Sequence, residues 1–191
     1  MAQSLQILAI SGSLRAASSN TAALRALSAL APADSQISLS DHIAALPFFN
    51  PDLENETDPL PASVQRFREE IGRVDGILIC SPEYAHGVPG VLKNALDWLV
   101  GSFEFPDKPV ALINISPRST YAHASLLETL KTMSATIIAD PAFNISIPRN
   151  RLDMAAMLGD EQVAWALSAA IVAFTQSLRS LKQANSEQQI V

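Results

Sequence analysis

The chain alternates between short, continuous apolar runs and longer segments whose apolar residues recur at every third or fourth position. The first pattern is typical of buried strands, and the second is typical of amphipathic helices. Five regions of the first kind lie between residues 5 and 147. Strands are predicted at 5–10, 37–39, 76–80 and 110–115, and a further strand is predicted within 136–147, as one piece or as two pieces interrupted by Asp140-Pro141.

Helices are predicted between these strands and after the last of them. The final helix is expected to end near Leu181, and the polar tail 182–191 is expected to fray. The segment 46–61 holds four prolines and little periodicity, and long loops of this kind are often functional. The predicted helices cover 20–31, 62–73, 88–100, the segment around 126–133, and 160–181.

Strand–helix alternation of this kind predicts an α/β protein with a doubly wound parallel sheet and helices on both faces. The strands near positions 78 and 113 are apolar at successive residues, which is expected when both faces of a strand are covered. The length of 191 residues favours one domain spanning 1–191. In such sheets ligands bind beyond the carboxyl ends of the strands, so the loops there are the places to search for a site.

Composition narrows the possible partners. Hydrophobic residues make up 48% and charged residues 17% of the chain, and the net charge is −6, which disfavours nucleic acid and anionic membranes as partners. The only cysteine is Cys80, so an internal disulfide is excluded and a reducing cytoplasm is expected. Residues 1–4 carry no Lys or Arg, so the basic start of a secretion signal is not expected there. No apolar run approaches the roughly 18 residues of a membrane span, so no membrane-spanning helix is expected.

The loop after the first strand reads SGSLRAASSN, from Ser11 to Asn20. It contains neither a GxGxxG dinucleotide motif nor a GxxxxGK[ST] phosphate loop. It also lacks Asp and Glu, which argues against a response-regulator-like module. Four serines, an asparagine and Arg15 instead lead into the helix. Such a helix start suits a terminal phosphate, although the same residues could be helix caps beside a solvated arginine.

The loop after the third strand reads SPEYAHGVPGVLKNALDWL, from Ser81 to Leu99. The proline that follows Ser81 favours extended backbone there, and Gly87 allows a turn with positive φ. Residues 83–86 should therefore form a stiff loop whose backbone could hold the edge of a planar heterocycle. The alternative is that Glu83, Tyr84 and His86 are ordinary surface side chains on an exposed turn.

Together, SGSLRAASSN and SPEYAHGVPGVLKNALDWL resemble the NADPH-dependent FMN reductase family, which includes quinone-, chromate- and azo-reducing bacterial enzymes. The resemblance covers residues 7–174. It implies a flavodoxin-like fold with a five-stranded parallel sheet, and FMN and NADPH as cofactors. The implied activity passes electrons from reduced nicotinamide through FMN to a small acceptor such as a quinone or free flavin. Because the flavin carries the chemistry, no acid–base catalyst is implied in the chain.

The resemblance assigns roles to both loops. The FMN phosphate would be held by the first loop and the edge of the flavin ring by the second, largely through backbone groups. The implied phosphate contacts are Ser13, Arg15, Ser18 and Asn20, and the implied ring contacts are Pro82, Glu83, Tyr84 and Ala85.

Two departures from the family pattern stand out. Many members have Asn at the position of Ala85, and Ser or Tyr at that of His86. The loop after the fourth strand, 116–123, has no glycine, although the family's loop is usually glycine-rich. Ser116 and Arg118 are the candidate cofactor contacts in this loop: Arg118 either meets a phosphate of the dinucleotide or is an exposed charge.

Two alternative functions share the expected fold. A flavodoxin-type electron carrier and an FMN-binding sensor would both bind FMN without turning over nicotinamide. Steady-state oxidation of NADPH distinguishes an enzyme from either. No basic cluster in the sequence marks a preference for NADPH over NADH.

The position of Trp98 on its predicted helix bears on whether the chain forms an oligomer. Trp98 falls, with Val91, about 90° away from the apolar face of the predicted helix 88–100. Members of the family are commonly dimers or tetramers, and we expect this helix to join a two-fold interface in a homodimer or homotetramer. The competing interpretation is that a neighbouring helix of the same chain covers Trp98.

Overall fold

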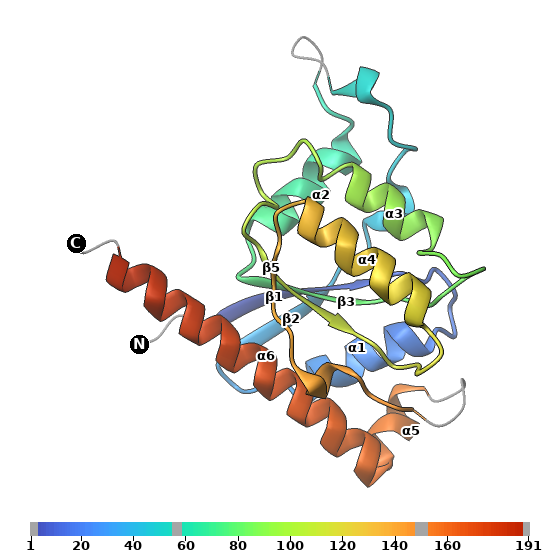
Figure 1. Cartoon of the computed structure of the whole chain (residues 1–191), viewed down its shortest axis with the longest axis vertical. Helices are drawn as coiled ribbons and strands as arrows, with labels where there is room; N and C mark the ends of the chain where they lie inside the picture. Colours follow the sequence, from blue (N-terminus) through green and yellow to red (C-terminus); the bar gives the residue numbers. More distant parts are fainter. Residues whose placement is uncertain (1–3, 55–58, 148–152, 189–191) are drawn as a thin grey trace.

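The computed structural model describes residues 4–54, 59–147 and 153–188. All of its strand pairings are parallel, and the strand order is β2-β1-β3-β4-β5. This order confirms the predicted flavodoxin-like α/β fold (Figure 1). The strands are β1 (Leu5–Ser11), β2 (Ser35–Leu39), β3 (Gly76–Cys80), β4 (Pro109–Ile113) and β5 (Thr136–Ile137).

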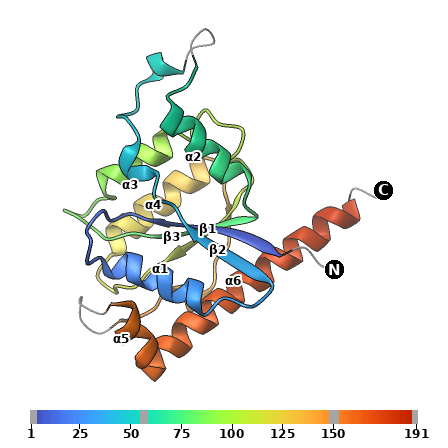
Figure 2. The same cartoon turned by 180° about the vertical axis from the view of Figure 1, so that it is seen from behind.

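Helices cover both faces of the sheet, as Figures 1 and 2 show from opposite sides. One face is covered by α1 (Ser19–Ala29), α5 (Met154–Gly159) and α6 (Glu161–Gln188). The other is covered by α2 (Ala62–Gly72), α3 (Gly90–Asp97) and α4 (Thr120–Thr132). Short 3₁₀ turns lie at Ile43–Ala45, Pro51–Leu53 and Pro141–Phe143.

The two layers of helices produce two hydrophobic cores. Along β3, Leu78 and Cys80 face the core with α1 and α6, whereas Ile77 and Ile79 face the core with α2, α3 and α4. Every residue of β3 is buried. This placement explains why the strand is apolar at successive positions, and it confirms the prediction made from that pattern.

Gly76 lets α6 pack tightly against the start of β3. A Cβ atom at this position would lie 2.7 Å from Leu178 Cδ2 and 3.0 Å from Phe174 Cζ. Both side chains are buried in the same core. The absence of a side chain at Gly76 therefore sets how closely the helix approaches the strand.

Helix α6 is longer than the sequence predicted. It continues past Leu181 to Gln188, and ion pairs hold it near the amino ends of the strands: Arg179 Nη2 lies 2.6 Å from Asp34 Oδ1, and Lys182 Nζ lies 2.7 Å from Asp75 Oδ1. Residues 182–188 therefore continue the helix, whereas the expected fraying of the tail stays a prediction, and 189–191 lie outside the described residues. No helix in the described ranges has both the length and the apolarity to cross a membrane.

The segment 136–147 forms less strand than predicted. β5 has only two residues, and Asn144 adds a single parallel bridge to Asn114. The interruption at Asp140-Pro141 is confirmed, because Asp140 Oδ1 accepts a hydrogen bond from Ala142 N (2.8 Å) and starts a 3₁₀ turn. The short helix α5 has no counterpart among the predicted elements.

Trp98 is fully buried within its own chain. Its Nε1 donates to Pro47 O (2.8 Å), and its ring meets that of Phe49 edge-on at 5.1 Å. One turn earlier, the side chain of Asn94 accepts from Phe49 N (2.8 Å) and donates to Pro47 O (3.0 Å). The loop that carries Pro47 and Phe49 therefore covers the Trp98 side chain, while Arg68 of α2 donates from Nε to Trp98 O (2.9 Å). Trp98 is buried by its own chain and gives no support to a two-fold interface, so the predicted oligomer stays a prediction without it.

The packing of α6 on Gly76 gives a test by substitution. We expect Gly76→Ala to lower the free energy of unfolding by about 1–3 kcal/mol, because the added methyl overpacks the core. Gly90→Ala is the matched control: apart from its chain neighbours and its own helix backbone, no atom of the described residues lies within 4 Å of a Cβ there, so the change should be neutral or stabilising by up to about 1 kcal/mol. Urea denaturation measures both, and an equal effect of the two changes would contradict the packing argument.

Candidate cofactor site

The site forms where the carboxyl ends of β1 and β3 lie next to each other. Ser11 pairs with Cys80 in the register, and Gly12 N then donates to Cys80 O (2.9 Å). A Cβ atom on Gly12 would lie 2.3 Å from Ser81 Oγ and 3.1 Å from Ser81 Cα. The β1–α1 and β3–α3 loops therefore touch at their base, and only glycine fits at the contact.

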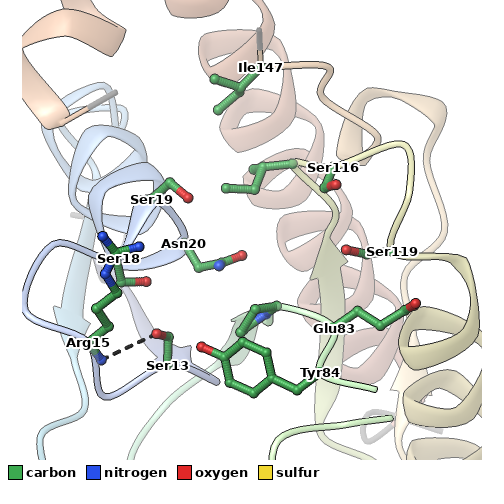
Figure 3. A pocket seen from close by; sticks show the side chains of 12 residues that line it. Ser13, Arg15, Ser18, Ser19, Asn20, Glu83, Tyr84, Ser116, Ser119 and Ile147 are labelled. Atoms are coloured by element: carbon green, nitrogen blue, oxygen red, sulfur yellow. Dashed lines mark hydrogen bonds between the residues drawn. The ribbon is translucent and has the colours of Figure 1, made fainter. Parts of the chain in front are cut away.

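A cavity of about 250 Å³ opens above this contact, between the start of α1, the β3–α3 loop and the β4–α4 loop (Figure 3). All of the predicted site residues line it except Ala85 and Arg118, which are exposed elsewhere on their loops. The structure also adds residues that the sequence did not single out. The lining consists of Ser13, Arg15, Ser18, Ser19, Asn20, Pro82, Glu83, Tyr84, Ile115, Ser116, Ser119 and Ile147.

The serines of the β1–α1 loop are held by backbone groups. Ser18 is the N-cap of α1 and its Oγ accepts from Thr21 N (3.3 Å), while Ser13 Oγ accepts from Arg15 N (3.3 Å). Both side chains are buried. Among the described residues, neither hydroxyl donates to a protein acceptor. Capping and ligand binding are therefore compatible here, since each hydroxyl proton remains available to an anion in the cavity.

Arg15 brings a positive charge to this end of the cavity. In the part of the chain that the structure describes, no carboxylate lies within ion-pair distance of its guanidinium. The start of α1 adds the partial positive charge of unpaired backbone N–H groups. The combination of free hydroxyls, an unpaired guanidinium and a helix N-terminus suits the phosphate of FMN.

Asn20 presents a further polar group to the same cavity. Its side chain is 8% exposed, and its Oδ1 accepts from Cys80 Sγ (3.2 Å). Burial raises the pKa of the Cys80 thiol, so the thiol stays protonated and acts as the donor. This leaves Asn20 Nδ2 without an acceptor in the described ranges and available to a ligand. No motif or spacing in the sequence indicates this role of Cys80.

The β3–α3 loop contains a tight turn. Tyr84 N donates to Gly87 O (3.1 Å), and Gly87 N donates to Tyr84 O (2.9 Å). The two residues between them have positive φ, 49° at Ala85 and 61° at His86, whereas Gly87 does not. The paired hydrogen bonds agree with the predicted stiff loop, but the positive φ angles fall on Ala85 and His86 and not on Gly87, the residue that the sequence offered for them. Left-handed backbone is unfavourable for residues with a Cβ, so the turn is strained.

Glu83 is neither a solvated charge nor a free base. Its Oε2 accepts from Ala122 N (2.9 Å) in the first turn of α4, and its Oε1 lies 3.3 Å from His86 Nδ1. The N-cap residue Ser119 makes no capping bond with its own side chain. Glu83 therefore caps α4 from another loop, which sequence spacing does not reveal.

His86 strengthens this attachment. Its ring meets the ring of Tyr121 edge-on, with centroids 4.3 Å apart. Glu83 and His86 thus fasten the β3–α3 loop to α4, across one wall of the cavity.

The β4–α4 loop forms that wall without any glycine. Asn114 Oδ1 accepts from Ser116 N (3.1 Å), and Ser119 N donates to Ser116 O (3.0 Å). These bonds hold Ser116 and Ser119 against the cavity. Arg118 is exposed and does not line it, so the structure does not bring Arg118 to the other candidate residues.

The two ends of the cavity differ in chemistry. In Figure 3, Ser13, Arg15 and Ser18 lie on the side of α1. Pro82 and the ring of Tyr84 lie on the β3–α3 loop, and apolar surface comes from Ile115 and Ile147. A molecule with a phosphate at one end and a planar ring at the other matches this division, so the residues present fit FMN.

Comparisons with known proteins agree with this geometry. The family model described as NADPH-dependent FMN reductase matches residues 5–150. The quinone reductase of Escherichia coli K12 is 34% identical over 161 residues, covering 80% of this chain and 84% of the relative. The NAD(P)H-dependent FMN reductase of Pseudomonas aeruginosa is 35% identical over 167 residues, covering 85% and 89%.

A solved structure extends the similarity to three dimensions. FerB, a flavoenzyme NAD(P)H:(acceptor) oxidoreductase from Paracoccus denitrificans, superposes with a TM-score of 0.76 at 28% identity, covering 92% of this chain and 98% of FerB. Sequence, fold and cavity agree, and the chain belongs to the NADPH-dependent FMN reductase family.

Proposed function

We propose that this chain is an FMN-dependent NAD(P)H oxidoreductase whose small acceptor is a quinone. The observation that carries the proposal is the cavity at the carboxyl ends of β1 and β3, with an arginine and free hydroxyls at one end and an aromatic, proline-bearing loop at the other. The quinone reductases among the relatives support the choice of acceptor. A 2-hydroxy-1,4-benzoquinone reductase from a Burkholderia species, 33% identical over 155 residues, supports it further.

When bound, FMN would supply the electron chemistry between a reduced nicotinamide and a quinone. The protein's part is to bind the cofactor and to orient it. Arg15 offsets the charge of the phosphate, Ser13 and Ser18 donate hydrogen bonds to it, and Asn20 Nδ2 offers another donor beside them.

The ring end depends on fixed backbone. The paired hydrogen bonds between Tyr84 and Gly87 hold the turn, and Glu83 ties it to α4 through Ala122 N. The carboxylate of Glu83 thereby has a positioning role at the start of α4. Pro82 and Tyr84 line the cavity from this loop, where they would contact the ring.

The predicted contacts at Ala85 and Arg118 lie outside the cavity. We propose a role for Ala85 only through the backbone of the turn. Arg118 is exposed, and we propose no contact between it and FMN.

We further propose a cytoplasmic homo-oligomer. A single, buried cysteine suits a reducing compartment. Phe48 is 90% exposed and Phe103 is 98% exposed, which a second copy of the chain could cover. Sedimentation at micromolar concentration tests the oligomer, and a single species of 20.4 kDa would contradict it.

The direct test of function is the visible spectrum of the purified protein. We expect flavin absorbance that bleaches when NADPH is added without oxygen and returns when a benzoquinone is added. Bound FMN that neither NADPH nor NADH bleaches would instead support an electron carrier or a sensor.

The phosphate end is tested by Arg15→Ala. A charge-assisted hydrogen bond contributes about 1.5–3 kcal/mol, so FMN affinity should fall roughly 10- to 100-fold. Riboflavin has the same ring without the phosphate, and its affinity should hardly change. Flavin fluorescence titration measures both dissociation constants. If the two affinities fell equally, Arg15 would act on the ring or on the fold and the phosphate assignment would be wrong.

The ring end is tested by Glu83→Ala. Loss of the cap on α4 should lower the free energy of unfolding by about 0.5–2 kcal/mol. Because the loop is then held less firmly, the affinities for FMN and for riboflavin should fall by the same factor. Glu83→Gln keeps an acceptor for Ala122 N and should be intermediate.

Asp160→Ala is the matched control for lost capping. Asp160 Oδ1 accepts from Gln162 N and Val163 N, both at 3.1 Å, at the start of α6. This change should cost similar stability and leave flavin affinity unchanged. An equal loss of flavin affinity in both variants would mean that Glu83 acts through general stability alone.

A further inference from the structure

A second, larger cavity of about 590 Å³ lies between α1 and α5, beside the cofactor cavity. The two helices pack against each other near the lower end of the molecule in Figure 2. The two cavities share Arg15 and Ser18 in their linings. A ligand could therefore pass from one to the other along the start of α1. We call this second cavity the α1–α5 groove; it is lined by Arg15, Ala16, Ala17, Ser18, Thr21, Ala22, Arg25, Asp153, Met154 and Ala155.

Two arginines give the groove its charge. Arg25 lies one helical turn after Thr21, on the same face of α1, and both residues line the groove. Neither Arg15 nor Arg25 has a carboxylate within ion-pair distance among the residues the structure describes. On a chain of net charge −6, two arginines that line one cavity without a carboxylate at ion-pair distance in the described ranges favour an anionic ligand.

The rest of the lining suits a flat organic group. Ala17, Ala22 and Ala155 contribute small apolar surfaces, and Met154 adds a polarizable thioether that adapts to planar rings. An apolar cavity with a few charged groups is typical of a site for a small organic ligand. The groove thus combines an apolar surface for a nucleobase with two guanidinium groups for a phosphate.

Asp153 is the one carboxylate among the described residues of the lining. Its Oδ1 accepts from Ala156 N (2.9 Å) as the N-cap of α5, which leaves the other oxygen to accept from an amino or hydroxyl group. An acidic residue alone would favour an unphosphorylated ribose. Because the groove has two arginines and Asp153 is already engaged as an N-cap, a phosphorylated ribose is favoured instead.

We propose that the α1–α5 groove binds the adenosine 2′-phosphate half of NADPH, and that Arg25 selects NADPH over NADH. The proposal rests on the proposed function, because it places the nicotinamide half over the cofactor cavity. The shared residues Arg15 and Ser18 lie where the dinucleotide would cross between the cavities. Arg25 is the discriminating residue, since it lines the groove and not the cofactor cavity.

The direct experiment uses adenosine 2′,5′-bisphosphate as a probe and needs no catalysis. Calorimetric titration of the FMN-loaded protein should show this probe binding at least tenfold more tightly than 5′-AMP. Arg25→Ala should lower the affinity for the bisphosphate by about tenfold, as expected for one charge-assisted contact, and leave the affinity for 5′-AMP unchanged. Arg66→Ala is the matched control: Arg66 is an exposed arginine on α2, on the opposite face of the sheet, and its loss removes the same charge.

Steady-state kinetics provide the second measurement. In Arg25→Ala the KM for NADPH should rise about tenfold, while kcat and the KM for NADH stay unchanged. FMN affinity should also stay unchanged, which separates Arg25 from the phosphate loop.

Several results would overturn the proposal. One is equal binding of the bisphosphate and 5′-AMP to the unmodified protein, and another is an equal effect of Arg66→Ala. A third is displacement of the bisphosphate by FAD together with a tenfold loss of FAD affinity in Arg25→Ala, which would assign the groove to the adenylate of FAD. Arg25-dependent binding of the bisphosphate without any oxidation of NADPH would refute the proposed function and leave the groove assignment standing.

Discussion

The pairing of β1 with β3 is the constraint on which the site depends. Because Ser11 and Cys80 end their strands at the same level of the sheet, the two loops that follow must start side by side. The contact of Gly12 with Ser81 then fixes how closely they can approach. Everything above this contact, including the start of α1 and the strained turn after β3, takes its position from it.

Much of the fold could be predicted from local patterns. The buried strand 76–80 and the helix near 62–73 match the structure closely, because their apolar spacing directly reflects what they pack against. The candidate residues of the first two loops also meet at one cavity. The register of parallel strands ensures this, since loops after adjacent strands share one edge of the sheet.

The remaining features depend on contacts between residues far apart in the chain. Glu83 caps α4 through Ala122, and Trp98 is covered by a loop that precedes it by some fifty residues, as its bond to Pro47 shows. Neither contact leaves a mark in sequence spacing. The α1–α5 groove is similar, because Arg15 and Arg25 come to line one cavity with Met154 only when α1 and α5 pack together.

The burial of Cys80 bears on how this protein withstands its own chemistry. Quinones are electrophiles that add to thiolates, and an enzyme that handles them exposes its surface to alkylation. The chain has a single cysteine, which is fully buried, and burial raises the pKa of its thiol. The thiol that orients Asn20 is therefore inaccessible and kept in its unreactive, protonated form. The protein therefore carries no exposed thiol that the proposed quinone acceptor could alkylate.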